Sequence, residues 1–206
     1  MKGLFVAMEG IDAVGKKTQT SLLQSWLTSN GLRSQAFSFP SYETTIGKEI
    51  KKFLAGAVSY PPQVRAMLYA ANRWEKKANL DKMLASTDVL LVNRYSGSNL
   101  AYGVSMGLKL DWLLGIESGL PPPDLVLVLD APASELSARR GENKDSYERN
   151  LALQSKARRI YLQLAKKFGW SVIDANRGVD ETNRNIVSVV KIALNRRTGK
   201  APRGGV

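Results

Sequence analysis

Short apolar runs alternate along the chain with segments whose apolar residues recur every three or four positions. The runs occupy residues 4–8, 88–92, 125–129 and 170–174, and a weaker alternation covers residues 33–39. Such runs are typical of strands in a parallel sheet that is buried on both faces. Helical periodicity covers residues 20–30 and 45–54, a long segment from Pro61, and two later segments. The alternation predicts a three-layer α/β fold with a five-stranded parallel sheet flanked by helices.

The helix predicted from Pro61 has two distinct faces. Its apolar stripe, which is expected to be buried, consists of Val64, Met67, Leu68 and Ala71. Arg65, Tyr69 and Arg73 lie four positions apart and therefore share another face. A ring and a cation on one face could stack on a nucleotide base and hydrogen-bond to its edge. On an arbitrary helix, a surface cation–π pair is the commoner arrangement.

A glycine-rich segment, residues 9–18, separates the first predicted strand from the first predicted helix. Gly10 and Gly15 permit a tight turn whose backbone N–H groups face one anion, and Lys16 adds a mobile positive charge. This is the arrangement of a P-loop, which holds the phosphates of ATP, so a P-loop NTPase fold is predicted. A glycine turn without a ligand is the less favoured alternative. The residues expected to bind ATP here are Gly10, Ile11, Asp12, Ala13, Val14, Gly15, Lys16, Lys17 and Thr18.

Lys17 departs from the P-loop pattern. The motif has Ser or Thr after the lysine, where the hydroxyl reaches Mg²⁺, whereas this chain has Lys17 and only then Thr18. An ammonium group has no lone pair and cannot ligate a metal ion. Lys17 either neutralises phosphate charge or extends into solvent, and the sequence leaves these two interpretations equally open.

Two other segments are rich in polar residues, and we expect one to bind a ligand and the other to form a lid. Residues 93–103 follow the predicted strand at 88–92, and ligands of open α/β sheets bind at the carboxyl ends of strands. Residues 139–148 are charged and short of apolar anchors, so we expect a mobile lid. The expected organisation is a single P-loop domain at 1–197, followed by a flexible basic tail at 198–206.

The composition narrows the classes of function. The 206-residue chain has no cysteine and no histidine, which excludes thiolate metal sites and the commonest general base. The net charge of +12 indicates anionic partners, either nucleotides or nucleic acid. For the basic tail, a solvated and disordered end is favoured over an arm that binds nucleic acid. No apolar run approaches the ~18 residues that span a membrane, and no signal-peptide pattern is present. We therefore expect a cytoplasmic protein without membrane association.

An ordered series of motifs, from about Phe5 to Glu181, resembles the thymidylate kinase family. The series comprises residues 9–12, 39–40, 71–75, 94–95, 98–99, 101–102, 123–125, 140–141, 147–148 and 174–175. The resemblance implies transfer of phosphate from ATP to dTMP, giving dTDP for dTTP synthesis. It also implies Mg²⁺ as a cofactor and a homodimer as the assembly.

The resemblance also implies roles for individual residues. Asp12 is expected to bind the sugar 3′-hydroxyl, Arg94 the monophosphate, and Tyr102 to exclude a ribose 2′-hydroxyl. Thymine is expected to lie against Phe39 and Tyr69, with Arg73 donating to O4. The remaining substrate-binding residues implied are Ser98, Asn99, which hydrogen-bonds thymine N3 in some family members, and Tyr147. The loop at 174–179, with Asn176, is expected to lie against adenine.

Catalysis is expected to depend on Lys16, Arg94, Arg140, Lys17 and Asn93. Some family members carry an arginine inside the P-loop, but Ala13 and Val14 occupy that region here. The lid is therefore expected to supply the cation, with Arg139, Arg140 and Lys144 as candidates. Asn93 stands where the family usually has Asp. No side chain is expected to ligate Mg²⁺ directly, although Glu9 and Asn93 could hold it through water.

Two alternatives to a dTMP kinase stay open at this stage. The first is a kinase of the same fold that acts on another pyrimidine deoxynucleotide, such as dUMP, since one methyl group gives only about 1–3 kcal/mol of discrimination. The second is a non-catalytic protein that binds nucleotides or nucleic acid. Formation of ADP that depends on dTMP distinguishes the enzyme from the binder.

Overall fold

The computed structural model describes residues 2–136 and 150–198. The predicted lid at 139–148, with Arg139, Arg140, Lys144 and Tyr147, lies outside the described residues. The predicted tail at 198–206 lies outside them too, apart from its first residue. That residue is the last of α8 (Val179–Thr198).

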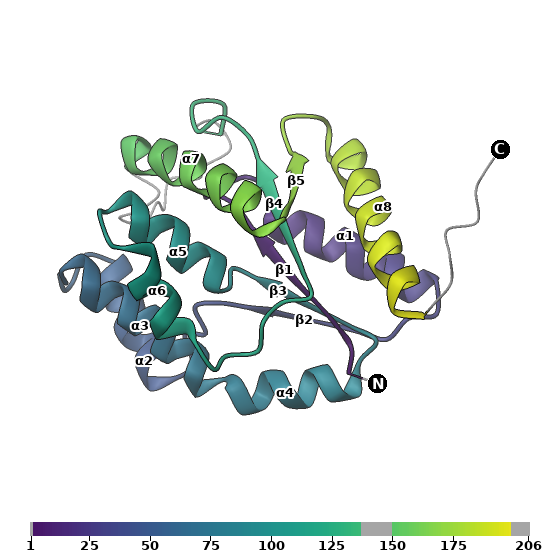
Figure 1. The fold of residues 1–206 in the computed structure, drawn as a ribbon, viewed down its shortest axis with the longest axis horizontal. Coiled ribbons are helices and arrows are strands. Elements are labelled where there is room, and N and C mark those ends of the chain that lie inside the picture. The colour runs from purple at the N-terminus through teal and green to yellow at the C-terminus, as the bar shows by residue number, and fades with distance from the viewer. Residues whose placement is uncertain (1, 137–149, 199–206) are drawn as a thin grey trace.

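A five-stranded parallel sheet forms the centre of the molecule, which confirms the predicted fold class (Figure 1). Its strands are β1 (Leu4–Glu9), β2 (Ser34–Ser38), β3 (Val89–Asn93), β4 (Leu125–Asp130) and β5 (Ser171–Asp174). Their order across the sheet is β2-β3-β1-β4-β5. The central strand β1 pairs with β3 on one side and with β4 on the other, so the loop after β1 lies between the loops that follow these neighbours.

Side chains of β1 alternate between two apolar clusters, and all six of its residues are buried. Leu4, Val6 and Met8 belong to the larger cluster, which includes residues of α1, α5, α7 and α8. Phe5 and Ala7 belong to a smaller cluster beneath α4. The helices therefore cover the sheet on both faces, as a strand of continuous apolar residues requires.

Eight helices accompany the sheet in the part of the chain that the structure describes. Those other than α8 are α1 (Lys16–Ser29), α2 (Thr45–Leu54), α3 (Pro62–Glu75), α4 (Lys77–Ser86), α5 (Ser96–Ser105), α6 (Leu110–Glu117) and α7 (Leu151–Phe168). The helix predicted at 45–54 has the predicted bounds, and the Thr44 hydroxyl caps it by accepting from the Gly47 N–H at 3.0 Å. None of the described helices is long and apolar enough to cross a membrane.

The buried face of α3 differs from the predicted apolar stripe. Ala66, Ala70 and Arg73 are buried, whereas Met67 is 45% exposed. The reason is that α3 packs against other helices, with small residues at the contact and with a partner that neutralises the buried Arg73. Side-chain hydrophobicity alone therefore predicted the wrong face.

Candidate active site

The loop between β1 and α1 has the backbone of a phosphate-binding turn. Gly10, Ala13 and Gly15 have positive φ angles of 130°, 63° and 97°. A Cβ atom at Gly10 would lie 2.4 Å from the carbonyl oxygen of Leu129, so only glycine fits there. The Lys16 ammonium folds over the loop and donates to the carbonyls of Gly10 and Ile11 at 3.0 and 2.7 Å.

The amino end of α1 is suited to an anion. Its N-cap is Gly15, which has no side chain to accept from the first N–H groups, and no acidic residue lies in the first turn. Those N–H groups and the helix dipole therefore favour a negatively charged ligand, as the sequence predicted for this loop.

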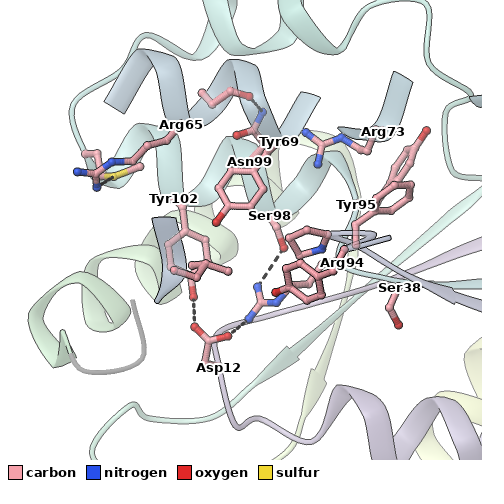
Figure 2. A pocket seen from close by; sticks show the side chains of 16 residues that line it. Asp12, Ser38, Arg65, Tyr69, Arg73, Arg94, Tyr95, Ser98, Asn99 and Tyr102 are labelled. Carbon is pink, nitrogen blue, oxygen red and sulfur yellow. Dashed lines mark hydrogen bonds and ion pairs between the residues drawn. The ribbon is translucent and has the colours of Figure 1, made fainter. Parts of the chain in front are cut away.

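A cavity of about 310 Å³ lies next to the loop, at the carboxyl ends of the central strands (Figure 2). It is lined by eight of the nine predicted substrate-binding residues, the ninth being Tyr147: these are Asp12, Phe39, Tyr69, Arg73, Arg94, Ser98, Asn99 and Tyr102. Arg65 also lines it, so the whole face of α3 that carries Arg65, Tyr69 and Arg73 turns toward one cavity. The surface cation–π interpretation of Tyr69 and Arg73 is therefore wrong.

Asp12 forms the junction between the P-loop and the cavity. Its carboxylate accepts hydrogen bonds from Arg94 Nη2 and from the Tyr102 hydroxyl at 2.9 Å (Figure 2). It also accepts one from Gln154 Nε2 at 2.5 Å. Burial raises the pKa of this carboxyl group, but the charges of Arg94 and Lys16 and these hydrogen bonds outweigh that effect and lower its pKa to about 2. Asp12 is therefore an anion across the physiological range.

Arg94 is held in an unusual backbone conformation directly after β3. Its φ angle is 58°, in the left-handed region that non-glycine residues seldom adopt. From there its guanidinium reaches Asp12, and its Nη1 donates to the Ser98 hydroxyl at 3.2 Å. Although burial acts in the opposite direction, Asp12 raises the pKa of Arg94, so the cavity contains a permanent cation beside the P-loop.

Glu9, the last residue of β1, holds the segment that contains Arg94 and Ser98 in place. The carboxylate is fully buried and accepts from the Tyr95 N–H at 2.8 Å, the Ser98 hydroxyl at 2.6 Å and the Tyr161 hydroxyl at 3.1 Å. Gly97 lies so close that an added Cβ would be 2.8 Å from a Glu9 oxygen. The start of α5 is thus fixed on the end of β1, which places Arg94 and Ser98.

Polar side chains at the opposite end of the cavity come from α3, α5 and α6. Arg73 donates through Nε to Glu117 Oε2 at 2.9 Å and through Nη2 to Glu117 Oε1. Asn99 Nδ2 donates to Glu117 Oε1 at 2.6 Å and to the Ala66 carbonyl at 3.0 Å. Tyr69 and Asn99 both line the cavity, so a flat ligand in it would meet a ring and hydrogen-bonding groups together.

Lys17 and Asn93 occupy different surroundings. Lys17 and Thr18 are exposed in the first turn of α1. Asn93, at the end of β3, accepts from the Thr20 hydroxyl at 2.7 Å and lies 3.4 Å from the Ser38 hydroxyl. Thr20, one turn further along α1, therefore contacts the residue that replaces the usual carboxylate. Among residues 2–136 and 150–198, no group of three or more acidic side chains could hold a metal ion.

The loop expected to lie against adenine is fastened to the P-loop helix. Gln19 of α1 donates to the Val179 carbonyl at 2.9 Å and accepts from Asn183 at 3.1 Å. Within the loop, the Asn176 N–H donates to Asp174 at 3.0 Å. Asn176 therefore lies on a segment whose end is held beside α1.

Comparisons with known proteins place these features in a family. A family model described as thymidylate kinase matches residues 8–186. The thymidylate kinase of Dictyostelium discoideum is 34% identical over 91% of this chain and 85% of its own length. That of Homo sapiens is 31% identical over 97% and 95%. The structure of the Candida albicans thymidylate kinase superposes with a TM-score of 0.83, at 28% identity, over 94% of this chain and 93% of its own.

The chain belongs to the thymidylate kinase family. Enzymes of this family are ATP-dependent nucleoside monophosphate kinases. Such an enzyme binds two substrates, and a P-loop with a separate cavity beside it provides a place for each.

Tyr42, Gln154 and Glu117 are among the residues of the site that the sequence did not predict. Tyr42 lines the cavity, Gln154 bonds to Asp12, and Glu117 bonds to Arg73 and Asn99. Tyr42 follows the Phe39-Pro40 pair, which was the one available signal. Gln154 is brought to the site by α7, which is fixed to the end of β4 through hydrogen bonds of 2.7 and 2.8 Å from Arg158 to Asp130. Neither its position nor that of Glu117 has a local sequence signal.

Proposed function

We propose that this thymidylate kinase family member transfers the γ-phosphate of ATP to the 5′-phosphate of dTMP, giving dTDP and ADP. One observation carries the proposal: Asp12 belongs to the P-loop and also lines the cavity. A nucleotide on the loop and a monophosphate in the cavity would therefore meet beside Arg94. Family membership supports the same activity.

The chemistry requires placement and charge neutralisation more than acid–base groups. An oxygen of the dTMP phosphate forms the new bond to the γ-phosphorus, while the bond from that phosphorus to the bridging oxygen of ADP breaks. Lys16 and the amino end of α1 would hold the donor phosphates, and Arg94 would hold the acceptor phosphate. Two anions brought together in this way no longer repel each other fully, which lowers the barrier.

The acceptor nucleoside would occupy the rest of the cavity. Asp12, which stays ionised, would accept from the 3′-hydroxyl, and Tyr102 would lie against the 2′ carbon. Tyr69 and Phe39 would hold the base ring, with Arg73 and Asn99 at its edge. The donor adenine would lie against the loop that contains Asn176.

Mg²⁺ is proposed to accompany ATP, where it would neutralise phosphate charge. Asn93 would hold its waters through the side-chain amide oxygen, the type of atom that Mg²⁺ prefers. Glu9, the other side chain predicted for this role, is fully buried and already accepts three hydrogen bonds, so it would act only through its neighbours. Because Mg²⁺ commonly retains several waters and binds through substrate phosphates, this sparse set of donors fits the ion.

The lid is proposed to supply a further cation during transfer. Arg140, with Arg139 and Lys144 as alternatives, would approach the transferring phosphate, and Tyr147 would contact the substrate. Replacement of Arg140 by Ala should lower kcat by at least tenfold without a matching change in the KM for dTMP. An unchanged kcat would shift this role to Arg139 or Lys144.

Steady-state formation of ADP tests the proposed function. ADP should form from ATP and Mg²⁺ only when dTMP is present, and Lys16→Met should abolish it while leaving the far end of the cavity intact. The acceptor panel should include dUMP, since the Candida albicans relative is described as having broad substrate specificity. Absence of turnover with every pyrimidine monophosphate, together with salt-dependent binding to DNA, would favour the non-catalytic alternative.

A homodimer in the cytoplasm is proposed as the working form. Met67 and Trp74 on α3, and Trp112 and Leu114 on the adjoining α6, are between 37% and 45% exposed. Large apolar side chains exposed on two adjoining helices favour a second copy as the cover for part of this surface. Light scattering should give a dimer for the wild type and a monomer for Trp112→Glu. A wild type that is monomeric at all concentrations would contradict the proposed assembly.

A further inference from the structure

Glu117 is a buried carboxylate for which the proposed transfer reaction has no use. It is the last residue of α6, is 8% exposed, and lies behind the polar end of the cavity. Its side chain makes three hydrogen bonds, two from Arg73 and one from Asn99. These are two of the residues proposed to face the base, so Glu117 holds both through one group.

The contacts of Asn99 fix the orientation of its amide. Its Nδ2 group has two hydrogens, which are directed to Glu117 Oε1 and to the Ala66 carbonyl. Both partners are acceptors only, so the amide cannot rotate without placing its oxygen against two other oxygens. Asn99 Oδ1 is therefore left toward the cavity, where it accepts no hydrogen bond from a described residue.

The contacts of Arg73, which also lines the cavity, leave its Nη1 group available as a donor. Nε and Nη2 are occupied by Glu117, and Nη1 donates to no residue that the structure describes. The guanidinium also lies 5.9 Å from the centre of the Tyr95 ring, which limits its movement. Arg73, Tyr95 and Asn99 all line the cavity, so the cavity contains a fixed acceptor and a fixed donor near each other.

This pair of groups matches one of the two kinds of pyrimidine edge. Thymine and uracil have a 4-carbonyl that accepts and an N3–H that donates. Cytosine has a 4-amino group that donates and an N3 that accepts, so each contact would be mismatched. We propose that Glu117 is a positioning residue that makes the cavity select 4-oxo pyrimidines over cytosine, by holding Asn99 and Arg73 in these orientations. This inference rests on the proposed function.

Replacement of Glu117 by Gln tests the inference, because it turns one acceptor into a donor. The single oxygen of Gln cannot accept from Arg73 Nε, Arg73 Nη2 and Asn99 Nδ2 together, so at least one of these groups loses its partner. The orientations of Asn99 and Arg73 are then no longer fixed, and the preference for a 4-oxo base weakens. Wild-type kcat/KM should be at least ~10³-fold lower for dCMP than for dTMP. In Glu117→Gln, the ratio of kcat/KM for dCMP to kcat/KM for dTMP should rise at least tenfold. The rise should come from a higher KM for dTMP, and the KM for ATP should be unchanged. Asp111→Asn removes an exposed charge from the same helix and should leave the ratio unchanged.

Several outcomes would overturn the inference. Equal losses for dCMP and dTMP in Glu117→Gln would make Glu117 a purely structural residue, and a wild type that uses both nucleotides equally would refute the selectivity itself. If Glu117→Gln fails to fold by circular dichroism, Glu117→Asp retains the charge opposite Arg73 but is one methylene too short to hold both partners. Glu117→Asp should raise the ratio of kcat/KM for dCMP to kcat/KM for dTMP at least threefold. An unchanged ratio would again refute the inference.

Failure of the proposed kinase function can be distinguished from failure of the inference about Glu117. If the wild type phosphorylates no pyrimidine nucleotide, the kinase proposal fails. Calorimetric titration of wild type and Glu117→Gln with dTMP and dCMP would still test base selection by binding alone. Tight binding of dTMP and weak binding of dCMP, with a narrower gap in the variant, is the expected result, and the same gap in both proteins would contradict it.

Discussion

Asp12→Asn probes the charged junction between the P-loop and the cavity. The pKa of Asp12 falls from 3.8 to about 2 on folding, and its side chain is 16% exposed. A tenfold change in proton affinity corresponds to about 1.4 kcal/mol, so ionisation of Asp12 stabilises the folded state by about 2 kcal/mol at neutral pH. The variant, which also leaves Arg94 without its counterion, should lose at least about 2 kcal/mol of unfolding free energy at pH 7.

The pH dependence distinguishes this electrostatic effect from a packing defect. Because the pKa is lower in the folded state, the unfolded chain binds the proton first as the pH falls. The stabilisation is complete above about pH 5, about half of it is lost near pH 3, and it disappears below about pH 2. Urea unfolding followed by tryptophan fluorescence at pH 7, 4 and 3 should show the gap between wild type and variant shrinking by about 1 kcal/mol.

A matched control separates this effect from a general change in charge. Asp111→Asn removes one exposed acidic charge from the same basic protein, so it measures the general effect of that loss. If the gap between wild type and Asp12→Asn is the same at pH 7 and pH 3, the proposed ion pair does not stabilise the fold, and the argument is refuted.

Three further predictions concern binding and turnover. Tyr69→Ala removes a stacking partner worth ~1–3 kcal/mol, so the KM for dTMP should rise about tenfold in steady-state assays; an equal rise for ATP would place the ring elsewhere. Tyr102→Ala should narrow the preference for dTMP over its ribose analogue, measured as a ratio of kcat/KM; a wild type without preference contradicts this role. Lys17→Ala should lower kcat at least tenfold, about 1.4 kcal/mol, in single-turnover assays; unchanged kcat would leave Lys17 a solvated side chain.

Features with a local physical cause could be predicted from the sequence. The central strands were predicted because a run such as 88–92 is apolar on both faces, and the P-loop because glycine spacing determines a turn. The side of α3 that carries Tyr69 and Arg73 was predicted because helical spacing alone places them together. The family's motifs then led to the cavity residues on α5.

Features that depend on contacts between distant segments could not be predicted. Helix α5 contains Gly97 and Gly103, each costing about 1 kcal/mol relative to Ala, but close contacts with Glu9 and Leu113 leave no space for a larger residue. Arg73 is buried because α6 brings Glu117, 44 positions away in sequence, to it. No hydrophobic pattern records such a pairing, so the exposure of the rest of α3 was also predicted wrongly.

The most direct measurement follows the γ-phosphate itself. The protein is incubated with γ-³²P-labelled ATP, Mg²⁺ and dTMP, and the nucleotides are separated by chromatography. We expect label in dTDP, little label in inorganic phosphate, and no loss of label from ATP when dTMP is omitted. Label released as inorganic phosphate without dTDP, or label that stays in ATP, would contradict the central claim that this site joins the two substrates for transfer.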